Sequence, residues 1–64
     1  MTEREREVVS LIGRGLMNRE IADRLVVSER TVEWHISNIY NRLSVRSRAQ
    51  LAVWSQENGL ADEE

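Results

Sequence analysis

The sequence predicts an all-α fold, a small four-helix bundle that contains a helix-turn-helix. Apolar residues recur at helical spacing along most of the 64-residue chain, and no segment alternates as a β-strand does. Residues that favour helix starts and ends bound each apolar stretch. We therefore expect one domain over residues 1–64, with helices at about 3–14, 18–25, 29–43 and 48–58 and a frayed end at 60–64.

The first helix is expected to begin at a capping box and to end near a glycine. At the spacing of Thr2 and Glu5, the threonine hydroxyl accepts the Glu5 backbone N–H while the Glu5 side chain reaches back. Gly15 suits a left-handed helix end, after which Leu16 is free to pack back. The apolar stripe of this helix consists of Val8, Val9, Leu11 and Ile12.

The second and third helices are joined by three residues, as in a helix-turn-helix. Helix 18–25 is too short to be stable alone in water, so it must pack on its neighbours. Asn18 is its expected cap, and Ser28 is the expected cap of helix 29–43. The predicted core positions of the two helices are Ile21, Ala22, Leu25, Val32, Ile36, Ile39 and Leu43.

A helical wheel of residues 29–43 places polar and aromatic side chains opposite this core stripe. The outward group consists of Arg30, Trp34, Ser37, Asn38 and Asn41. Arginine, asparagine and serine are suited to the edges of bases in the major groove of DNA. Large exposed aromatics usually have a partner, although Trp34 could instead cover part of a neighbouring loop.

The borders of this outward face carry residues of mixed chemistry. Thr31 and Arg42 lie on one shoulder of the helix, Glu33 and Tyr40 lie on the other, and His35 borders the core. Glu33 has two possible roles. It pairs with Arg30 one turn away, or it accepts a hydrogen bond from a cytosine amino group.

The fourth helix is expected to begin at a second capping box, formed by Ser47 and Gln50, and to end at Gly59. Apolar residues wrap around more of this helix than one buried face needs. We expect its core face to consist of Ala49, Ala52, Val53 and Gln56. We expect a homodimer face made of Leu51, Trp54 and Ser55, with the alternative that Trp54 only covers the core.

Charge is unevenly distributed along the chain, whose net charge is −2. Residues 30–48 carry four arginines against one acid, whereas residues 49–64 carry four acids and no base. A nucleic acid responds to this distribution and not to the total. The alternative is that the charges only solvate helix surfaces.

Several kinds of site are excluded by composition. The chain has no cysteine and a single histidine, His35, so disulfides and cysteine or histidine zinc sites are not expected. No phosphate-binding loop or cluster of titratable groups indicates catalysis or a cofactor, so we expect no enzyme. No apolar run approaches the ~20 residues that cross a membrane, and no signal-peptide pattern opens the chain, so we expect a cytoplasmic protein.

Taken together, the motifs resemble the LuxR/NarL-type (GerE-like) helix-turn-helix domain of bacterial transcription regulators. The similarity runs from Thr2 to about Leu60 and includes the segments TEREREV, GLMNREIADRL, SERTVEWHISNI and RLSVRSRAQ. It implies a DNA-binding module with helix 29–43 in the major groove and helix 48–58 as a dimer interface. The implied base-reading residues are Glu33, Trp34 and Ser37. The implied phosphate or groove-edge residues are Thr31, His35, Asn38, Asn41 and Arg42.

The resemblance also implies a structural charge pair between Glu5 and Arg48.

The chain departs from the family pattern at three positions. Glu33 stands where the family usually has lysine, which reverses the sign of one contact. Met17 lacks the usual capping hydroxyl, so residues 17–20 do not form a capping box, and a cap is lost unless Asn18 substitutes. Ser44 replaces a glycine at a turn that favours a positive φ.

The sequence as a whole predicts a sequence-specific DNA-binding transcription regulator that binds an inverted repeat as a homodimer. The alternative is a protein-interaction module on the same scaffold, because a fold alone does not fix its partner. Members of the family are usually tethered to an upstream receiver or ligand-binding domain. The chain is therefore either a fragment of such a protein or a stand-alone regulator. In both cases we expect it at the bacterial nucleoid.

Overall fold

The protein is seen in a computed structural model that describes residues 1–61, and its helices confirm the all-α prediction. They are α1 (Glu3–Gly13), α2 (Asn18–Leu25), α3 (Glu29–Leu43) and α4 (Arg48–Glu57). The predicted and observed ends differ by no more than one residue. No helix within residues 1–61 is long and apolar enough to span a membrane.

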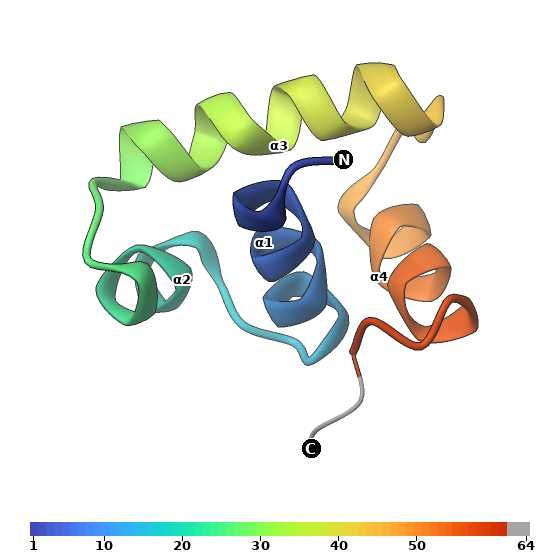
Figure 1. The fold of residues 1–64 in the computed structure, drawn as a ribbon, viewed down its shortest axis with the longest axis horizontal. Coiled ribbons are helices and arrows are strands. Elements are labelled where there is room, and N and C mark those ends of the chain that lie inside the picture. Colours follow the sequence, from blue (N-terminus) through green and yellow to red (C-terminus); the bar gives the residue numbers. More distant parts are fainter. Residues whose placement is uncertain (62–64) are drawn as a thin grey trace.

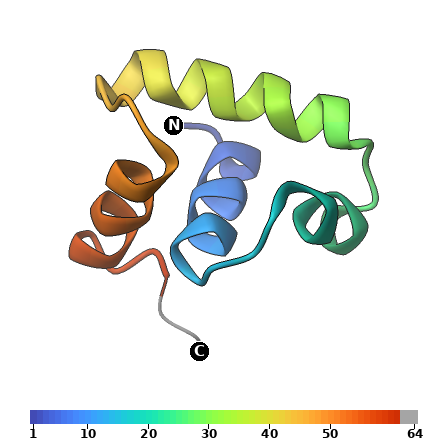
Figure 2. The same cartoon turned by 180° about the vertical axis from the view of Figure 1, so that it is seen from behind.

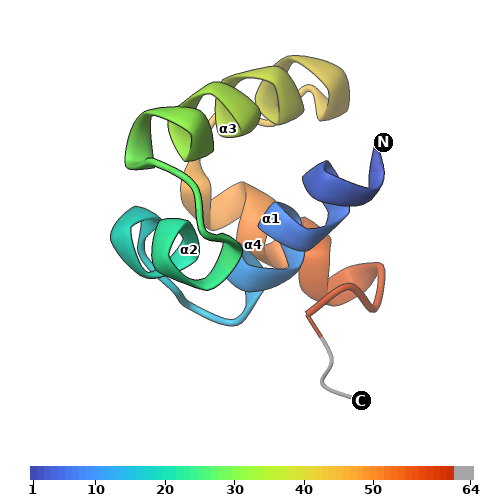
Figure 3. The ribbon, with the colours of Figure 1, turned by 60° about the vertical axis from the view of Figure 1, so that its left-hand side comes forward.

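The long helix α3 lies across the other helices of the bundle. In Figure 1 it runs along the top of the molecule, with α2, α1 and α4 beneath it, and Figure 2 shows the same order from behind. α1 packs mainly against α4, and α2 packs mainly against α3. Figure 3 shows that one long side of α3 is left uncovered by the other helices. This arrangement makes α3 the most prominent helix of the surface.

All four helices contribute to one hydrophobic core. The predicted stripes of α1, α2 and α3 are confirmed, with Leu25 and Leu43 packed against the core as partly buried residues. The buried apolar residues are Val8, Val9, Leu11, Ile12, Ile21, Ala22, Val32, Ile36, Ile39 and Leu51. Because the core side of α3 is fixed by these contacts, its opposite side is directed toward solvent.

The predicted N-caps of α1, α3 and α4 are present. The Thr2 hydroxyl accepts the Glu5 N–H at 3.1 Å, and the Glu5 carboxylate accepts the Thr2 N–H at 2.9 Å, which completes the capping box. Ser28 and Ser47 accept backbone N–H groups at the starts of α3 and α4. Gln50 differs slightly from prediction, because its side chain accepts the N–H of Arg46 at 2.7 Å.

The predicted cap of α2 is wrong. Met17 occupies the N-cap position, and Asn18 is the first residue of the helix. Glu20 accepts the Met17 N–H at 2.8 Å, so the acidic half of a capping box is present although Met17 has no side-chain oxygen to complete it. The Asn18 side chain instead accepts a hydrogen bond from Arg48.

All four helices end in the same way, with a left-handed residue followed by an apolar residue that packs back. The left-handed residues are Gly15, Val26, Ser44 and Gly59, with φ between 58° and 91°. In each case the next residue donates its N–H to the carbonyl five positions earlier, which is the Schellman motif. The packed apolar residues are Leu16, Val27, Val45 and Leu60. The predicted ends at Gly15 and Gly59, and the positive φ at Ser44, are confirmed.

Val26 is the unexpected member of this set. It is β-branched, has a φ of 59° and is 88% exposed. A left-handed conformation costs an L-residue about 1–2 kcal/mol, and asparagine tolerates it better than valine. We expect Val26→Asn to raise the free energy of unfolding by about 1 kcal/mol, measured by urea denaturation. The control is Val53→Asn, the same change at an exposed valine inside a helix, which should give no increase.

The predicted orientation of α4 is wrong. Leu51 and Ser55, which were expected to face a second subunit, are completely buried inside the monomer. Val53, which was expected in the core, is 51% exposed, and Ala49 and Gln56 are exposed as well. Trp54 is partly buried and packs against the core.

A close approach between α1 and α4 explains this orientation. A Cβ atom added to Gly13 would lie only 2.8 Å from the Ser55 Cβ. The two helices therefore meet where both side chains are small or absent. Once Ser55 lies against Gly13, Leu51 one turn earlier on the same face of α4 enters the core.

The expected fraying after α4 is also wrong at Leu60. This residue packs against the core, and its N–H donates to the Ser55 carbonyl at 2.9 Å. Residues 62–64, the last three of the segment that was expected to fray, lie outside the described residues.

Candidate nucleic-acid interface

The uncovered side of α3 presents most of the residues that the sequence singled out. Its exposed members are Arg30, Glu33, Trp34, Ser37, Asn41 and Arg42, whereas Thr31, His35 and Asn38 are partly buried. Because the core side is fixed by Val32, Ile36 and Ile39, these residues project from one rigid helix. Together they offer two guanidinium cations, a carboxylate, two amides, two hydroxyls, an imidazole and an indole.

Trp34 is the largest apolar group on this face and is 63% exposed. Its ring contacts His35 edge-on, with the ring centroids 5.1 Å apart and the planes inclined at 66°. His35 lies on the core border, as predicted, and its Nδ1 is buried without a hydrogen-bond partner. The imidazole thus supports one side of the indole, and the rest of the indole remains open to a partner.

Two of the predicted contact residues are already engaged within the protein. The Thr31 hydroxyl lies 3.0 Å from the Ser28 hydroxyl at the start of α3, so part of its hydrogen-bonding capacity is used by the cap. Arg42 forms an ion pair with Glu5 of α1, with Arg42 Nη1 and Glu5 Oε1 3.4 Å apart. In contrast, no ion pair joins Glu33 to Arg30 within residues 1–61.

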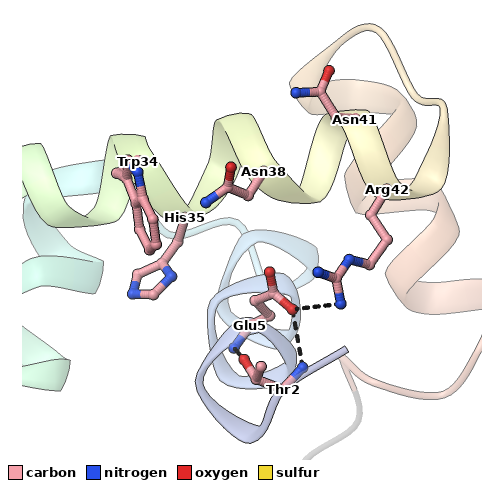
Figure 4. A pocket seen from close by; sticks show the side chains of 7 residues that line it. All are labelled: Thr2, Glu5, Trp34, His35, Asn38, Asn41 and Arg42. Carbon is pink, nitrogen blue, oxygen red and sulfur yellow. Dashed lines mark hydrogen bonds and ion pairs between the residues drawn. The ribbon is translucent and has the colours of Figure 1, made fainter.

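An open groove runs between α3 and the first turn of α1 (Figure 4). Thr2 and Glu5 form its α1 side, and five residues of α3 form the other side. These are Trp34, His35, Asn38, Asn41 and Arg42. Its volume is about 540 Å³, and its lining is rich in hydrogen-bonding groups. Within residues 1–61, no group of three or more histidine or acidic side chains is placed to hold a metal ion.

Glu5 is the buried acid of this groove. Its side chain is only 7% exposed, whereas that of Arg42 is 52% exposed. The hydrogen bond from the Thr2 backbone N–H lowers the pKa of Glu5 below its ordinary value of 4.5, burial opposes this effect, and the charge of Arg42 assists it. Glu5 is therefore ionised at neutral pH, and the ion pair neutralises Arg42 at the edge of the interface.

The expected pair between Glu5 and Arg48 is wrong. Arg48 Nη1 donates to the Asn18 side-chain oxygen at 2.7 Å, and Arg48 Nη2 donates to the Leu16 carbonyl at 2.6 Å. Arg48 therefore connects the start of α4 to the loop before α2. Glu5 is paired with Arg42 of α3 instead.

Comparison with known proteins agrees with this architecture. Residues 1–55 match the family model described as bacterial regulatory proteins of the luxR family. The chain belongs to this family. It is 48% identical over 61 residues to the transcriptional regulatory protein LnrK of Bacillus subtilis, covering 95% of this chain and 28% of that protein.

Two further relatives are also similar to the luxR-family chain over one part of their length. The transcriptional regulatory protein LiaR of B. subtilis is 40% identical over 62 residues, covering 97% of this chain and 29% of LiaR. The nitrate/nitrite response regulator protein NarL of Escherichia coli K12 is 41% identical over 54 residues, covering 84% of this chain and 25% of NarL. The chain thus spans less than a third of the length of these relatives.

The luxR-family chain is therefore a DNA-binding helix-turn-helix domain of a transcriptional regulator and not an enzyme. Sequence reasoning found the residues on α3 but missed the groove, because Thr2 and Glu5 join it from α1. The local signal at these two residues was the capping box, and the resemblance linked Glu5 to Arg48 and not to α3. Nothing in the spacing indicates that Glu5 lies beside Arg42.

Proposed function

We propose that this luxR-family domain binds double-stranded DNA in a sequence-specific manner, with α3 in the major groove. The observation that supports this most strongly is Trp34, which is 63% exposed at the centre of an otherwise polar helix face. An α-helix fits the width of the major groove, and side chains on its outer face reach base edges there. The site of action is then the bacterial nucleoid in the cytoplasm.

Each exposed side chain has a role in this proposal. Arg30 is suited to guanine, Asn41 to adenine, and the indole of Trp34 to the methyl group of thymine. Ser37 hydrogen-bonds to several bases, and Glu33, which has no ion pair with Arg30, is free to accept from a cytosine amino group. Four further residues contact the DNA backbone and fix the position of α3. They are Thr31, in the first turn of the helix, and the groove residues His35, Asn38 and Arg42.

We also propose a homodimer through the exposed side of α4, which places two copies of α3 on an inverted repeat about one DNA turn apart. Leu51 and Ser55 are excluded from this contact because they are buried in the monomer. Val53, Ala49 and the exposed edge of Trp54 remain available. The patch is small, so DNA or another domain is needed to add affinity. An upstream receiver or ligand-binding domain would supply the controlling signal.

The binding proposal is tested by fluorescence anisotropy with sites selected from random DNA, at several salt concentrations. Binding should weaken with salt, with a log–log slope of about −0.9 for each neutralised phosphate. Trp34→Ala should reduce discrimination between selected and random DNA by roughly tenfold, the value of a base contact, without unfolding the domain. Met17→Ala, which truncates another exposed apolar side chain outside α3, is the control. Absence of binding by the unaltered chain would contradict the proposal.

A further inference from the structure

We propose that Glu5 competes with DNA phosphates for Arg42 and thereby lowers the affinity of the domain for DNA of any sequence. This inference rests on the proposed function and adds to the interface a residue from outside α3. It starts from the ion pair in the groove, where Glu5 and Arg42 are 3.4 Å apart (Figure 4).

The two partners differ in freedom. Glu5 is held by its capping box, because its carboxylate accepts the Thr2 N–H and its own N–H donates to the Thr2 hydroxyl. Its side chain is also nearly buried. Arg42 has a long flexible side chain that is half exposed at the edge of the groove. A DNA phosphate can therefore draw Arg42 outward, whereas Glu5 has to stay where it is.

Breaking the ion pair between Arg42 and Glu5 reduces the free energy gained on DNA binding. When Arg42 turns to a phosphate, it loses its ion pair and leaves a nearly buried carboxylate without its cationic partner. Arginine contacts to phosphate supply the affinity that does not depend on base sequence. Competition at Arg42 should consequently act equally on specific and non-specific DNA.

Glu5→Gln is the direct test, because glutamine keeps an oxygen for the Thr2 N–H and suits the same capping position. The matched control is Glu7→Gln, which removes the same charge from α1 at an exposed acid paired with Arg4. Both variants are first checked for folding by circular dichroism. Binding is then measured on a short labelled duplex of arbitrary sequence at several salt concentrations.

We expect Glu5→Gln to bind random DNA up to about fivefold more tightly, the equivalent of one surface ion pair. Its salt dependence should steepen by up to about 0.9 in log–log slope, because Arg42 neutralises a phosphate in a larger fraction of the complexes. The gain beyond the Glu7→Gln control should disappear when Arg42 is changed to alanine in the same chain. The gain should be the same on selected and random DNA.

Other results would overturn the inference. If Glu5→Gln gains no more than Glu7→Gln, or gains equally without Arg42, then Glu5 does not compete for Arg42. A loss of affinity would mean that Glu5 positions Arg42 for binding. If the unaltered chain binds no DNA at all, the proposed function itself fails, which is a distinct outcome.

A measurement on the unaltered chain covers the case in which Glu5→Gln does not fold. In isotope-labelled protein, the side-chain NMR signals of both Glu5 and Arg42 should shift when random duplex DNA is added at low salt. The exposed pair Arg4–Glu7 serves as the internal control and should shift less. An unchanged Glu5 carboxyl signal while Arg42 shifts would show that the ion pair persists on DNA, and would overturn the competition.

Discussion

Gly13→Ala should lower the free energy of unfolding by about 2–3 kcal/mol, the usual cost of forcing extra volume into a packed site. At an exposed position inside a helix, Gly→Ala raises the free energy of unfolding by about 1 kcal/mol. The close packing at Gly13 is expected to reverse the sign of this change. The new Cβ would lie 2.8 Å from the Cβ atoms of both Ser55 and Ala61. Both contacts are shorter than side-chain carbons allow, so α1 and α4 have to separate.

Urea denaturation measures this effect, and a second substitution tests its cause. Ser55→Gly removes the opposing Cβ, so the double variant should recover part of the lost free energy. The Ser55 hydroxyl is buried without a hydrogen-bond partner, so its removal breaks no hydrogen bond. Gly15→Ala is the control, because it meets no atom within 4 Å and suffers only from its φ of 91°. A more stable Gly13→Ala chain would contradict the close approach.

Leu51→Ala should cost about 2–5 kcal/mol of stability, as expected for a large apolar side chain removed from a core. Leu51 is fully buried in the monomer. Val53→Ala, on the exposed side of the same helix, should cost no more than about 0.5 kcal/mol. Denaturation curves at several protein concentrations separate folding from association.

Self-association should be affected more by Val53→Ala than by Leu51→Ala, the reverse of their effects on stability. Sedimentation of the DNA complex should show that Val53→Ala weakens the dimer, whereas the folded fraction of Leu51→Ala should dimerise normally. If Leu51→Ala left the monomer as stable as the unaltered chain and weakened only the dimer, Leu51 would face the second subunit and not the core. The two residues are only two positions apart on one helix, so they differ chiefly in the side of α4 that they occupy.

Local features of the fold were predictable because their causes are local. Capping boxes, left-handed glycines and apolar stripes act within a few residues of one another, and the helix bounds follow from them. The rotation of α4 was not predictable, because it depends on Gly13 and Ser55 meeting across the bundle. Hydrophobicity was misleading there, since a serine is buried and a valine is exposed.

The interface was predictable to a similar extent. The outward face of α3 follows from its own periodicity, so Trp34 was placed correctly. The partners of the two arginines could not be predicted from the sequence, because Arg42 and Arg48 bind groups more than 29 residues away in the chain. An ion pair between helices depends on where the helices cross, and the spacing within one helix carries no information about that.

Arg48 affects the partial unfolding of the domain as well as the packing of its folded state. Its hydrogen bonds to Leu16 and Asn18 close a chain loop that contains the whole of α2 and α3. The strongest packing lies within the pairs α1–α4 and α2–α3, an arrangement in which each pair could unfold as a separate cooperative unit. Because Arg48 belongs to one pair and binds the start of the other, it opposes such partial unfolding. Helix α3 is thereby tied to the cooperative stability of the whole bundle.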